Sequence, residues 1–239
     1  MKTIKLFSIV LISALISLSP ILQAAQSGNK KQTRTVSEFH GISVSSGIDL
    51  YLTQKNIQEV SVEADADDMG NLVTEVEGGI LKIYMKDKSW LNMDWDHTTR
   101  KVYVSFKTLD KLMASAGSDV TSQSVLNLER LDLDTSSGSD VKLELNANEL
   151  SAESSSGSHI SLKGKTNTLK VSASSGSNIN ADDFQAKTCD ANVSSGSDIR
   201  VNVTGQLDAH ASSGGNIGYS GNPARKDINE SSGGDVHQR

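Results

Sequence analysis

The sequence of 239 residues is poor in cysteine, proline and aromatic residues. Cys189 is the only cysteine, which excludes a disulfide within the chain. Two prolines are too few for a collagen-like chain or a proline-rich linker, and 4% aromatic residues are too few for an aromatic-rich core. The core must therefore be built from aliphatic side chains, and stability must come from packing and hydrogen bonds.

The chain also lacks an excess of basic residues. It carries 29 acidic and 23 basic side chains, which gives a formal net charge of −6 at pH 7. This charge becomes −8 when residues 1–25 are removed, because Lys2 and Lys5 leave without any acidic residue. A nucleic-acid partner requires a basic surface, so this class of function is not expected.

The first 25 residues have the pattern of a secretory signal peptide. Two lysines precede an apolar segment over residues 6–18, Pro20 ends it, and Leu-Gln-Ala-Ala at residues 22–25 offers small residues for cleavage. The alternative is an uncleaved anchor, for which about 13 apolar-rich residues are short. We predict a signal peptide over residues 1–25 and a mature domain over residues 26–239. Export would be to the periplasm or the cell surface, without a lipid-anchor cysteine.

One motif recurs along the mature chain and defines its organisation. Ser-Ser-Gly, or a close variant, is followed two residues after the glycine by Asp, Asn or His, and three residues after it by an aliphatic residue. From the second copy onward the glycines are 18–21 residues apart, which indicates one structural unit per repeat, stacked on its neighbours. The glycines of the copies are Gly47, Gly117, Gly138, Gly157, Gly176, Gly196, Gly214 and Gly233.

Apolar and polar side chains alternate around each glycine. From Gly117 onward, the residue three positions after the glycine is always Val or Ile, and most residues seven and five positions before it are Leu, Val or Ala. This period of two predicts strands with one buried face. Cys189 occupies one of these inward positions, so we predict that it is buried. Because every later apolar stretch alternates in this way, no transmembrane segment is expected after the signal peptide.

A unit of about 19 residues, made of strand and a glycine-containing corner, fits few architectures. It is too short for a four-stranded propeller blade and lacks the helix of a leucine-rich repeat. Winding each unit once around a common axis stacks like residues at about 4.8 Å. The sequence therefore predicts an all-β fold, a single-stranded parallel β-helix (β-solenoid) with about 19 residues per turn. At the bend, glycine permits a positive φ, and we expect the Asp, Asn or His after it to adopt or cap this conformation.

The early part of the mature chain is less regular. Gly47 and Gly117 are 70 residues apart, and the motif is absent between them. We predict irregular early turns with insertions over residues 36–115 and regular repeats over residues 115–236. Strand-like runs cover residues 60–64, 81–85 and 102–106, and a short helix or an acidic loop is expected over residues 64–71.

Several of these stretches together resemble one protein family. They are Phe-His-Gly-Ile-Ser-Val at residues 39–44, Gly-Ile-Asp-Leu-Tyr-Leu-Thr-Gln at residues 47–54, the strand-like runs between residues 60 and 85, the serial Ser-Gly-Ser-Asp-Val repeats, and Tyr-Ser-Gly-Asn-Pro at residues 219–223. From about residue 36 to residue 236 the chain resembles the head GIN domain family, whose members are described as autotransporter adhesins. The resemblance implies a right-handed β-helix in an exported bacterial envelope protein and implies no known chemistry.

The aspartates two residues after the glycines invite a calcium interpretation, since stacked Gly-Asp repeats bind Ca²⁺ in nonapeptide β-rolls. Here the period is about 19 residues, and His159, Asn178 and Asn216 interrupt the column. A structural corner role is the simpler interpretation. The aspartates of the column are Asp49, Asp119, Asp140, Asp198 and Asp235.

A second acidic group follows the first strand-like run. It comprises Glu63, Asp65, Asp67 and Asp68, for which a solvated acidic loop is simpler than a cation site. The histidines show no His-Glu-x-x-His spacing, and no serine lies in a Gly-x-Ser-x-Gly elbow. A serine that recurs at the same corner of every turn is a structural residue. We therefore predict no metal, no cofactor, no catalytic residue and no enzymatic activity.

The candidate binding residues are Trp90, Trp95, Asp94 and His97. The two tryptophans are the only ones in the chain, and they lie in an irregular excursion over residues 87–100. Aromatic side chains beside acids and amides suit stacking on sugars. The alternative is that this segment covers an open end or a flank of the solenoid.

The sequence thus favours an exported, non-enzymatic β-solenoid that binds a cell-envelope or surface partner in an adhesin-like way, with polysaccharide as one class of ligand. A rigid stack offers side chains at fixed intervals and hence many weak contacts to a repetitive ligand. Exposed strand edges at the ends make a homo-oligomer a further hypothesis. The alternatives are a periplasmic structural or small-ligand or lipid-binding protein and, less favoured, a carbohydrate-active β-helix enzyme.

Overall fold

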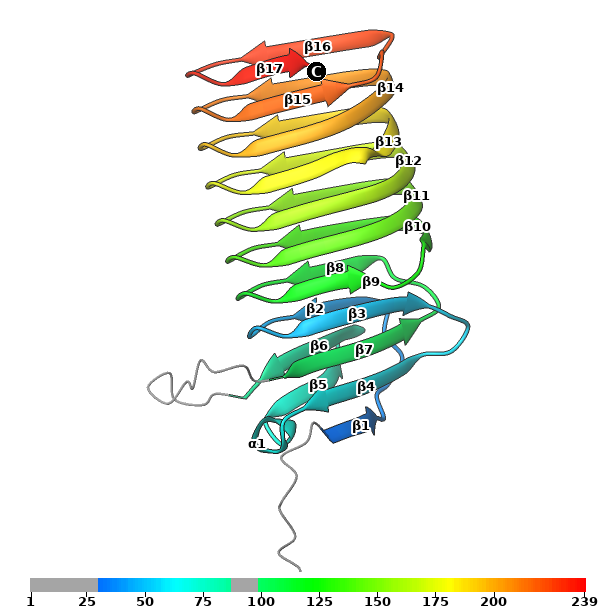
Figure 1. The fold of residues 1–239 in the computed structure, drawn as a ribbon. Helices are drawn as coiled ribbons and strands as arrows, with labels where there is room; N and C mark the ends of the chain where they lie inside the picture. The colour runs from blue at the N-terminus through cyan, green and yellow to red at the C-terminus, as the bar shows by residue number, and fades with distance from the viewer. Residues whose placement is uncertain (1–29, 87–98) are drawn as a thin grey trace, which may run out of the picture.

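The computed structural model describes residues 30–86 and 99–239 and shows a stack of parallel coils (Figure 1). The predicted signal peptide over residues 1–25 lies outside the described residues. The predicted binding residues lie outside them as well: Trp90, Asp94, Trp95 and His97.

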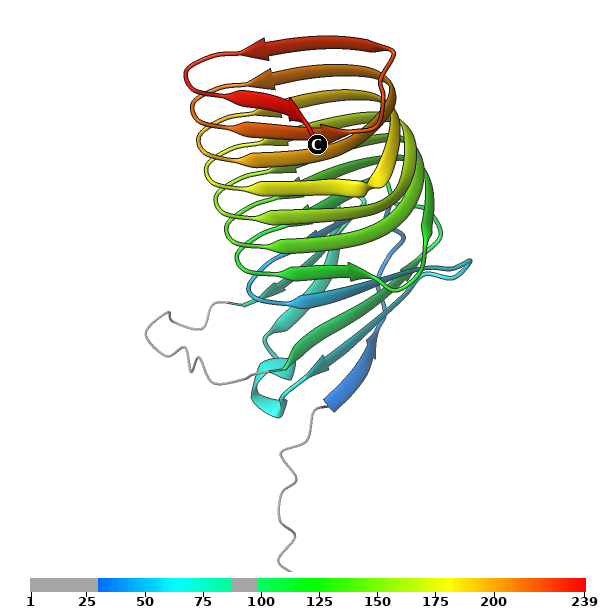
Figure 2. The same cartoon turned by 45° about the horizontal axis from the view of Figure 1, so that its top comes forward.

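Each regular coil contains two strand segments, joined by a tight turn on one side of the stack and by a wide corner on the other (Figures 1 and 2). Successive coils pair in parallel and in register, so that Val141 lies beside Ile160, and Ile160 beside Ile179. This arrangement confirms the predicted β-solenoid of about 19 residues per turn. The strands of the regular coils are β10 (Leu126–Thr135), β11 (Asp140–Ser154), β12 (His159–Ala173), β13 (Asn178–Val193), β14 (Asp198–Ala211), β15 (Asn216–Ser220), β16 (Arg225–Glu230) and β17 (Asp235–Gln238).

The core fills the space between the two strand segments of each coil. Its residues are those at the predicted inward positions, which form columns along the axis. Cys189 is buried, as predicted, and burial raises the pKa of its thiol. Full burial of one aliphatic side chain contributes about 1.5–3 kcal/mol, so each column stabilises several coils at once. One such column is Leu131, Leu150, Leu169, Cys189 and Leu207.

The Ser-Ser-Gly motif forms the tight turn. In the fourth copy, Ser156 has φ 55° and Gly157 has φ 72°, so both central residues are left-handed, and the Ser158 N–H donates to the Ser155 carbonyl at 3.3 Å. Two positive φ angles define a type I′ turn, the turn that matches the twist of the flanking strands. The expectation that the Asp, Asn or His after the glycine adopts this conformation is wrong. That residue, His159 in this copy, is the first residue of the next strand.

The serine directly after the glycine also has a structural role in the motif. In five copies this side chain is buried inside the turn. The Ser139 hydroxyl oxygen accepts the Ser118 N–H of the preceding coil at 3.1 Å, and the Ser197 hydroxyl oxygen accepts the Ser177 N–H at 3.2 Å. The serines satisfy backbone groups that the tight turn takes out of the strand ladder. They are Ser118, Ser139, Ser158, Ser177 and Ser197.

The early part of the chain differs from a simple succession of irregular turns. The first motif copy forms a complete coil, β2 (Gly41–Val44) and β3 (Asp49–Gln54). It stacks directly on the coil of the second copy, β8 (Lys111–Ala114) and β9 (Asp119–Ser122), and the Gly47 N–H donates to the Ala116 carbonyl at 3.0 Å. Two copies that are 70 residues apart in the sequence are therefore neighbours in space.

The residues between these two copies extend the stack on its other side. The strands β6 (Ile80–Met85) and β7 (Arg100–Phe106) pair in parallel with β2 and β3. Antiparallel strands then cover this end: β4 (Glu59–Ala64) pairs with β7, β5 (Leu72–Glu77) with β6, and β1 (Lys30–Arg34) with β4 (Figure 1). The helix α1 (Ala66–Met69) lies in the predicted 64–71 segment. In the described part of the chain, no helix has the length and apolar character needed to cross a membrane.

The wide corner depends on Gly164. Its φ is +117°, and a Cβ atom there would collide with the carbonyl oxygen of Leu145 in the preceding coil. Because the conformation alone costs up to about 3 kcal/mol for other residues, and the collision adds to it, we expect Gly164→Ala to lower the free energy of unfolding by about 3 kcal/mol or more. Gly157→Ala is the control, since a Cβ at this turn meets no atom within 4 Å. It should cost about 1–2 kcal/mol in urea unfolding. Equal losses would contradict the role given to the corner.

Candidate functional site

The outer surface of β3 and β7 carries two stacked tyrosine rings. Tyr51 and Tyr103 are register partners on these strands, with ring centroids 5.1 Å apart and planes inclined by 18°. Each tyrosine follows and precedes a buried aliphatic residue, which forces its ring to the outer face. We call this pair the tyrosine platform.

The antiparallel strands at this end of the stack complete the surroundings of the platform. The Lys31 ammonium of β1 lies 4.9 Å from the centroid of the Tyr103 ring, within the range of a cation–π interaction. The Tyr103 hydroxyl donates to a Glu63 carboxylate oxygen at 3.3 Å. Burial and the charge of Glu63 raise the pKa of Tyr103, and the hydrogen bond to Glu63 restrains the orientation of the ring.

A polar hollow adjoins each ring. The hollow beside Tyr103 has a volume of about 350 Å³, and the hollow beside Tyr51 has a volume of about 160 Å³. Both contain charged groups and hydroxyls within reach of a molecule lying on the rings. The first is lined by residues including Lys31, Thr33, Thr53, Lys55, Glu59, Ser61 and Gln123, and the second by residues including Asp49, Asp119, Thr121, Asp140 and Lys142.

Three carboxylates of the predicted aspartate column meet in the smaller hollow. Asp49, Asp119 and Asp140 are register partners on successive coils. Partial burial raises the pKa of Asp119, and the charges of Asp140 and Asp49 raise it further. Among the described residues, no group of three or more acidic, histidine or cysteine side chains has a geometry that could hold a metal ion. The column instead supplies acceptors that favour a hydrogen-bond donor such as a hydroxyl.

The second acidic group of the sequence has structural partners. Asp68 is buried and lies 2.7 Å from Arg100 Nε, and an Asp65 carboxylate oxygen accepts the Thr99 N–H at 3.3 Å. The expectation of a solvated loop is therefore wrong for Asp68, because its carboxylate pairs with the guanidinium that begins β7. This pair joins α1 to the strand that carries Tyr103.

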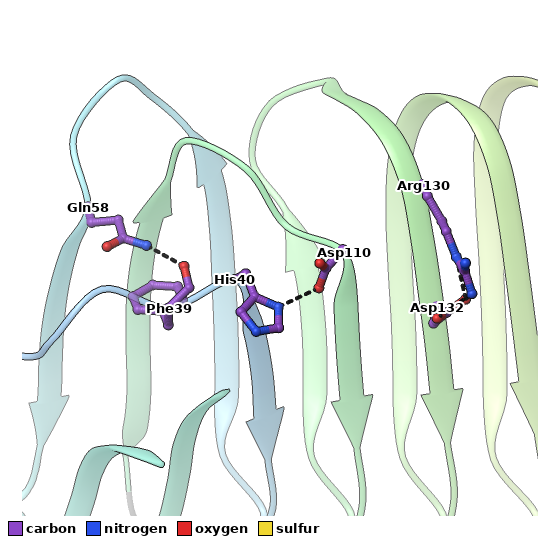
Figure 3. Close-up of polar contacts among 6 residues, drawn as sticks. All are labelled: Phe39, His40, Gln58, Asp110, Arg130 and Asp132. Carbon is purple, nitrogen blue, oxygen red and sulfur yellow. Dashed lines mark hydrogen bonds and ion pairs between the residues drawn. The ribbon is translucent and has the colours of Figure 1, made fainter. Parts of the chain in front are cut away.

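Polar contacts at the edge of the early coils hold loops in place (Figure 3). His40 Nδ1 lies 2.8 Å from an Asp110 carboxylate oxygen, and the Gln58 side-chain amide donates to the Phe39 carbonyl at 2.6 Å. His40 and Asp110 are both more than half exposed. This pair joins two loops.

Sequence reasoning did not identify the tyrosine platform as a site. The two tyrosines lie on β3 and β7, which β4, α1, β5 and β6 separate in the sequence. A shared pattern was available, because each is an aromatic residue between two aliphatic ones: Leu50 and Leu52 flank Tyr51, and Val102 and Val104 flank Tyr103. This pattern predicts outward-facing rings, although it does not show that the strands are neighbours.

Comparison with known proteins agrees with this architecture. The family model described as "Putative auto-transporter adhesin, head GIN domain" matches residues 38–223. No curated protein is a significant match to the chain.

Solved structures share the fold. A "putative adhesin" from Bacteroides fragilis NCTC 9343 is 20% identical, with a TM-score of 0.78 over 88% of this chain and 97% of that one. From Parabacteroides distasonis ATCC 8503, a "Putative lipid binding protein" is 23% identical, with a TM-score of 0.71, and a "putative adhesin" is 20% identical, with a TM-score of 0.70. Each of these two covers 90% of this chain and 98% of its own. At these identities the likeness concerns the fold. The family match, which spans most of the described coils, shows that the chain belongs to the head GIN domain family.

Proposed function

We propose that this protein is an exported, non-enzymatic binding protein that recognises a glycan of the cell envelope or of a cell surface through the tyrosine platform. The observation that carries the proposal is the pair of stacked, outward rings with a polar hollow on each side. The family description, which names adhesins, supports the same class of function.

The chemistry of the platform suits a sugar ring. The Tyr103 ring lies between the Tyr51 ring and the Lys31 ammonium, so the Tyr51 ring face toward the smaller hollow is the one that can pack against the apolar face of a sugar. Carboxylates, ammonium groups and hydroxyls around the rings can exchange hydrogen bonds with the sugar hydroxyls. Asp119 and Asp140 are acceptors in one hollow, and Lys55 is a donor in the other. Because the rings are held by strand pairing and by Glu63, little side-chain entropy is lost on binding.

Export and the tryptophan segment belong to the same proposal. The predicted signal peptide over residues 1–25 would deliver the mature chain to the periplasm or the cell surface, where envelope glycans are found. Trp90, Asp94, Trp95 and His97 precede β7 in the sequence, and we retain them as proposed contacts that would extend the site.

A lipid-binding function is the alternative suggested by the name of one structural relative. It needs an apolar cavity or groove. The hollows beside the platform are lined mainly by charged and hydroxyl side chains. Among residues 30–86 and 99–239, the large apolar residues that are exposed belong to three separate segments of the chain: Ile57, Val125 and Ile228. The observations therefore favour a hydroxyl-rich ligand.

Replacing the platform tests the proposal. Tyr51→Ala and Tyr103→Ala should each weaken binding to glycans captured on an array of bacterial and host oligosaccharides by about tenfold, equivalent to about 1.4 kcal/mol. Tyr84→Ala is the matched control, because Tyr84 is a half-buried tyrosine on β6 whose hydroxyl donates to Glu75 at 2.8 Å, away from both hollows. The proposal fails if no glycan binds the mature protein or if all three variants bind equally.

A further inference from the structure

A groove runs along the wide corners of the stack, on the side opposite the Ser-Ser-Gly turns. It is a hollow of about 820 Å³ at the bends of the strands β10 to β14. Its floor consists of residues that are register partners on successive coils and are mostly small. They are Leu128, Ala147 and Thr166. We call this feature the corner groove.

Two columns of polar side chains flank this floor, because the residues before and after each floor residue point outward. The columns cross four coils, a length of about 14 Å at the strand spacing. They consist mainly of amides, with two lysines toward one end and one glutamate at the other. The first wall is Asn127, Asn146, Lys165 and Gln185, and the second wall is Glu129, Asn148, Asn167 and Lys187.

The amides of the walls are held in one orientation. Along the second wall, the Asn167 amide donates to Asn148 Oδ1 at 2.8 Å, and the Asn148 amide donates to Glu129 Oε1 at 3.1 Å. Along the first wall, the Asn146 amide donates to Asn127 Oδ1 at 3.1 Å. Each of these donations uses one of the two N–H groups of an amide, so the second N–H is left for water or a ligand. The groove is therefore preorganised.

The backbone beneath the walls is also fixed. Threonine hydroxyls donate to carbonyl oxygens of the preceding coil where the chain bends. The Thr166 hydroxyl donates to the Asn148 carbonyl at 3.1 Å, the Thr188 hydroxyl to the Asn167 carbonyl at 3.0 Å, and the Thr204 hydroxyl to the Ala186 carbonyl at 3.3 Å. These bonds give a partner to backbone carbonyl groups that the bend would otherwise leave without a hydrogen bond. The groove thus presents side chains to a ligand more than backbone.

We propose that the corner groove binds a linear polysaccharide that lies along the axis of the stack. Repeated amides at a constant spacing match a chain of repeated hydroxyl-bearing units, and each coil adds a similar set of weak contacts. An extended peptide is less suited, because the strands of these coils are already paired on both sides and Leu128 is the one large apolar residue of the floor. The negative net charge disfavours a nucleic acid.

The inference stands apart from the tyrosine platform. The platform belongs to β3 and β7, whereas the groove belongs to β10 to β14. A flat ring platform holds one or two sugar units, and its affinity should depend little on the length of the ligand. A groove across the successive coils β10 to β14 predicts that affinity rises with oligosaccharide length until the groove is filled.

Native gel electrophoresis of the mature protein in gels that contain a soluble linear polysaccharide tests the groove. The probes are xylan, laminarin, pullulan and polygalacturonate, followed by oligosaccharides of increasing length from the polymer that retards the protein most. The double variant Asn148→Ala, Asn167→Ala removes two amides of the second wall, and the double variant Asn127→Ala, Asn146→Ala removes two amides of the first wall. Each should weaken retardation by about tenfold. The control is Asn192→Ala, which removes a half-buried amide on β13 that donates to Asp190 at 2.7 Å, away from the groove.

Several outcomes would overturn the proposal. These are no retardation by any of the four polymers, an affinity independent of oligosaccharide length, or groove variants that bind as well as the Asn192→Ala control. Tyr51→Ala should leave retardation unchanged. If Tyr51→Ala abolishes retardation while the groove variants do not, the polysaccharide binds at the platform and the groove assignment is wrong.

Discussion

Arg100→Ala is expected to lower the free energy of unfolding by about 3–5 kcal/mol. The Asp68 carboxylate is 2% exposed, and the Arg100 guanidinium, 18% exposed, lies 2.7 Å from it. Removing the guanidinium takes a close cationic partner from a buried carboxylate, and the loss of such a partner in a poorly hydrated site is costly. Arg100 is also the first residue of β7, so the defect lies in the strand that carries Tyr103.

Arg130→Ala is the matched control for this prediction. Arg130 forms an ion pair with Asp132 at 3.0 Å, and both side chains are well exposed, at 61% and 40%. An exposed pair contributes at most about 1 kcal/mol. Urea unfolding of both variants by circular dichroism measures the difference. If the two losses are the same, burial of the Asp68 carboxylate does not stabilise the N-terminal end in the way inferred here.

The coils could be predicted from sequence because their pattern is local and repeated. A period of two within each unit assigns the inward face, and a period of about 19 between units assigns the neighbour, so Val141 and Ile160 can be paired without a structure. The same periodicity places Cys189 in a column of leucines, where it is buried. Within the coils, the prediction was wrong about the turn. The residue that shares the positive φ with the glycine is the serine before it, as at Ser156, and not the Asp, Asn or His after it.

The N-terminal end was less predictable for a physical reason. Its strands pair with partners far away in the sequence, and some pair antiparallel, so no repeat links them. The motif at Gly47 predicts a coil but not that this coil lies beside the one at Gly117. The tyrosine platform forms only because the chain returns after β6 and places β7 beside β3. The corner groove was missed for a different reason: its amides occur at positions where an Asn-rich repeat offers no distinguishing pattern.

Charged side chains occupy the last coil at the β16 and β17 end of the stack. The strand β16 pairs with β14, and β17 with β15, and in the described part of the chain no further strand covers them. Two inward positions of the last coil carry charged residues. Lys226 is the register partner of Leu207 in the preceding coil, and Glu230 is the register partner of Ala211. The Lys226 ammonium lies 5.7 Å from the centroid of the Tyr219 ring, and a Glu230 carboxylate oxygen accepts the Val236 N–H at 2.7 Å. Inward charges on an edge oppose pairing with another chain.

The double variant Lys226→Leu, Glu230→Ala should therefore associate through this end. The two substitutions restore the residues that the preceding coil has at the same positions, Leu207 and Ala211, and they extend the apolar columns to the open edge. Terminal repeats of solenoids need a polar outer face to stay soluble, so its loss should shift the protein toward larger species than the unmodified protein forms at about 10 µM, corresponding to about −7 kcal/mol of association energy. Sedimentation velocity over a concentration series measures this change.

The matched control is Lys170→Leu, Glu153→Ala, which makes the same chemical changes at outward positions on the side of the stack. The control adds as much apolar surface and removes the same charges, but it leaves the terminal coil intact, so it should sediment like the unmodified protein. If both double variants associate equally, general loss of surface polarity is the cause. If neither associates, Lys226 and Glu230 do not protect the edge, and the geometry of β16 and β17 alone prevents another strand from pairing there.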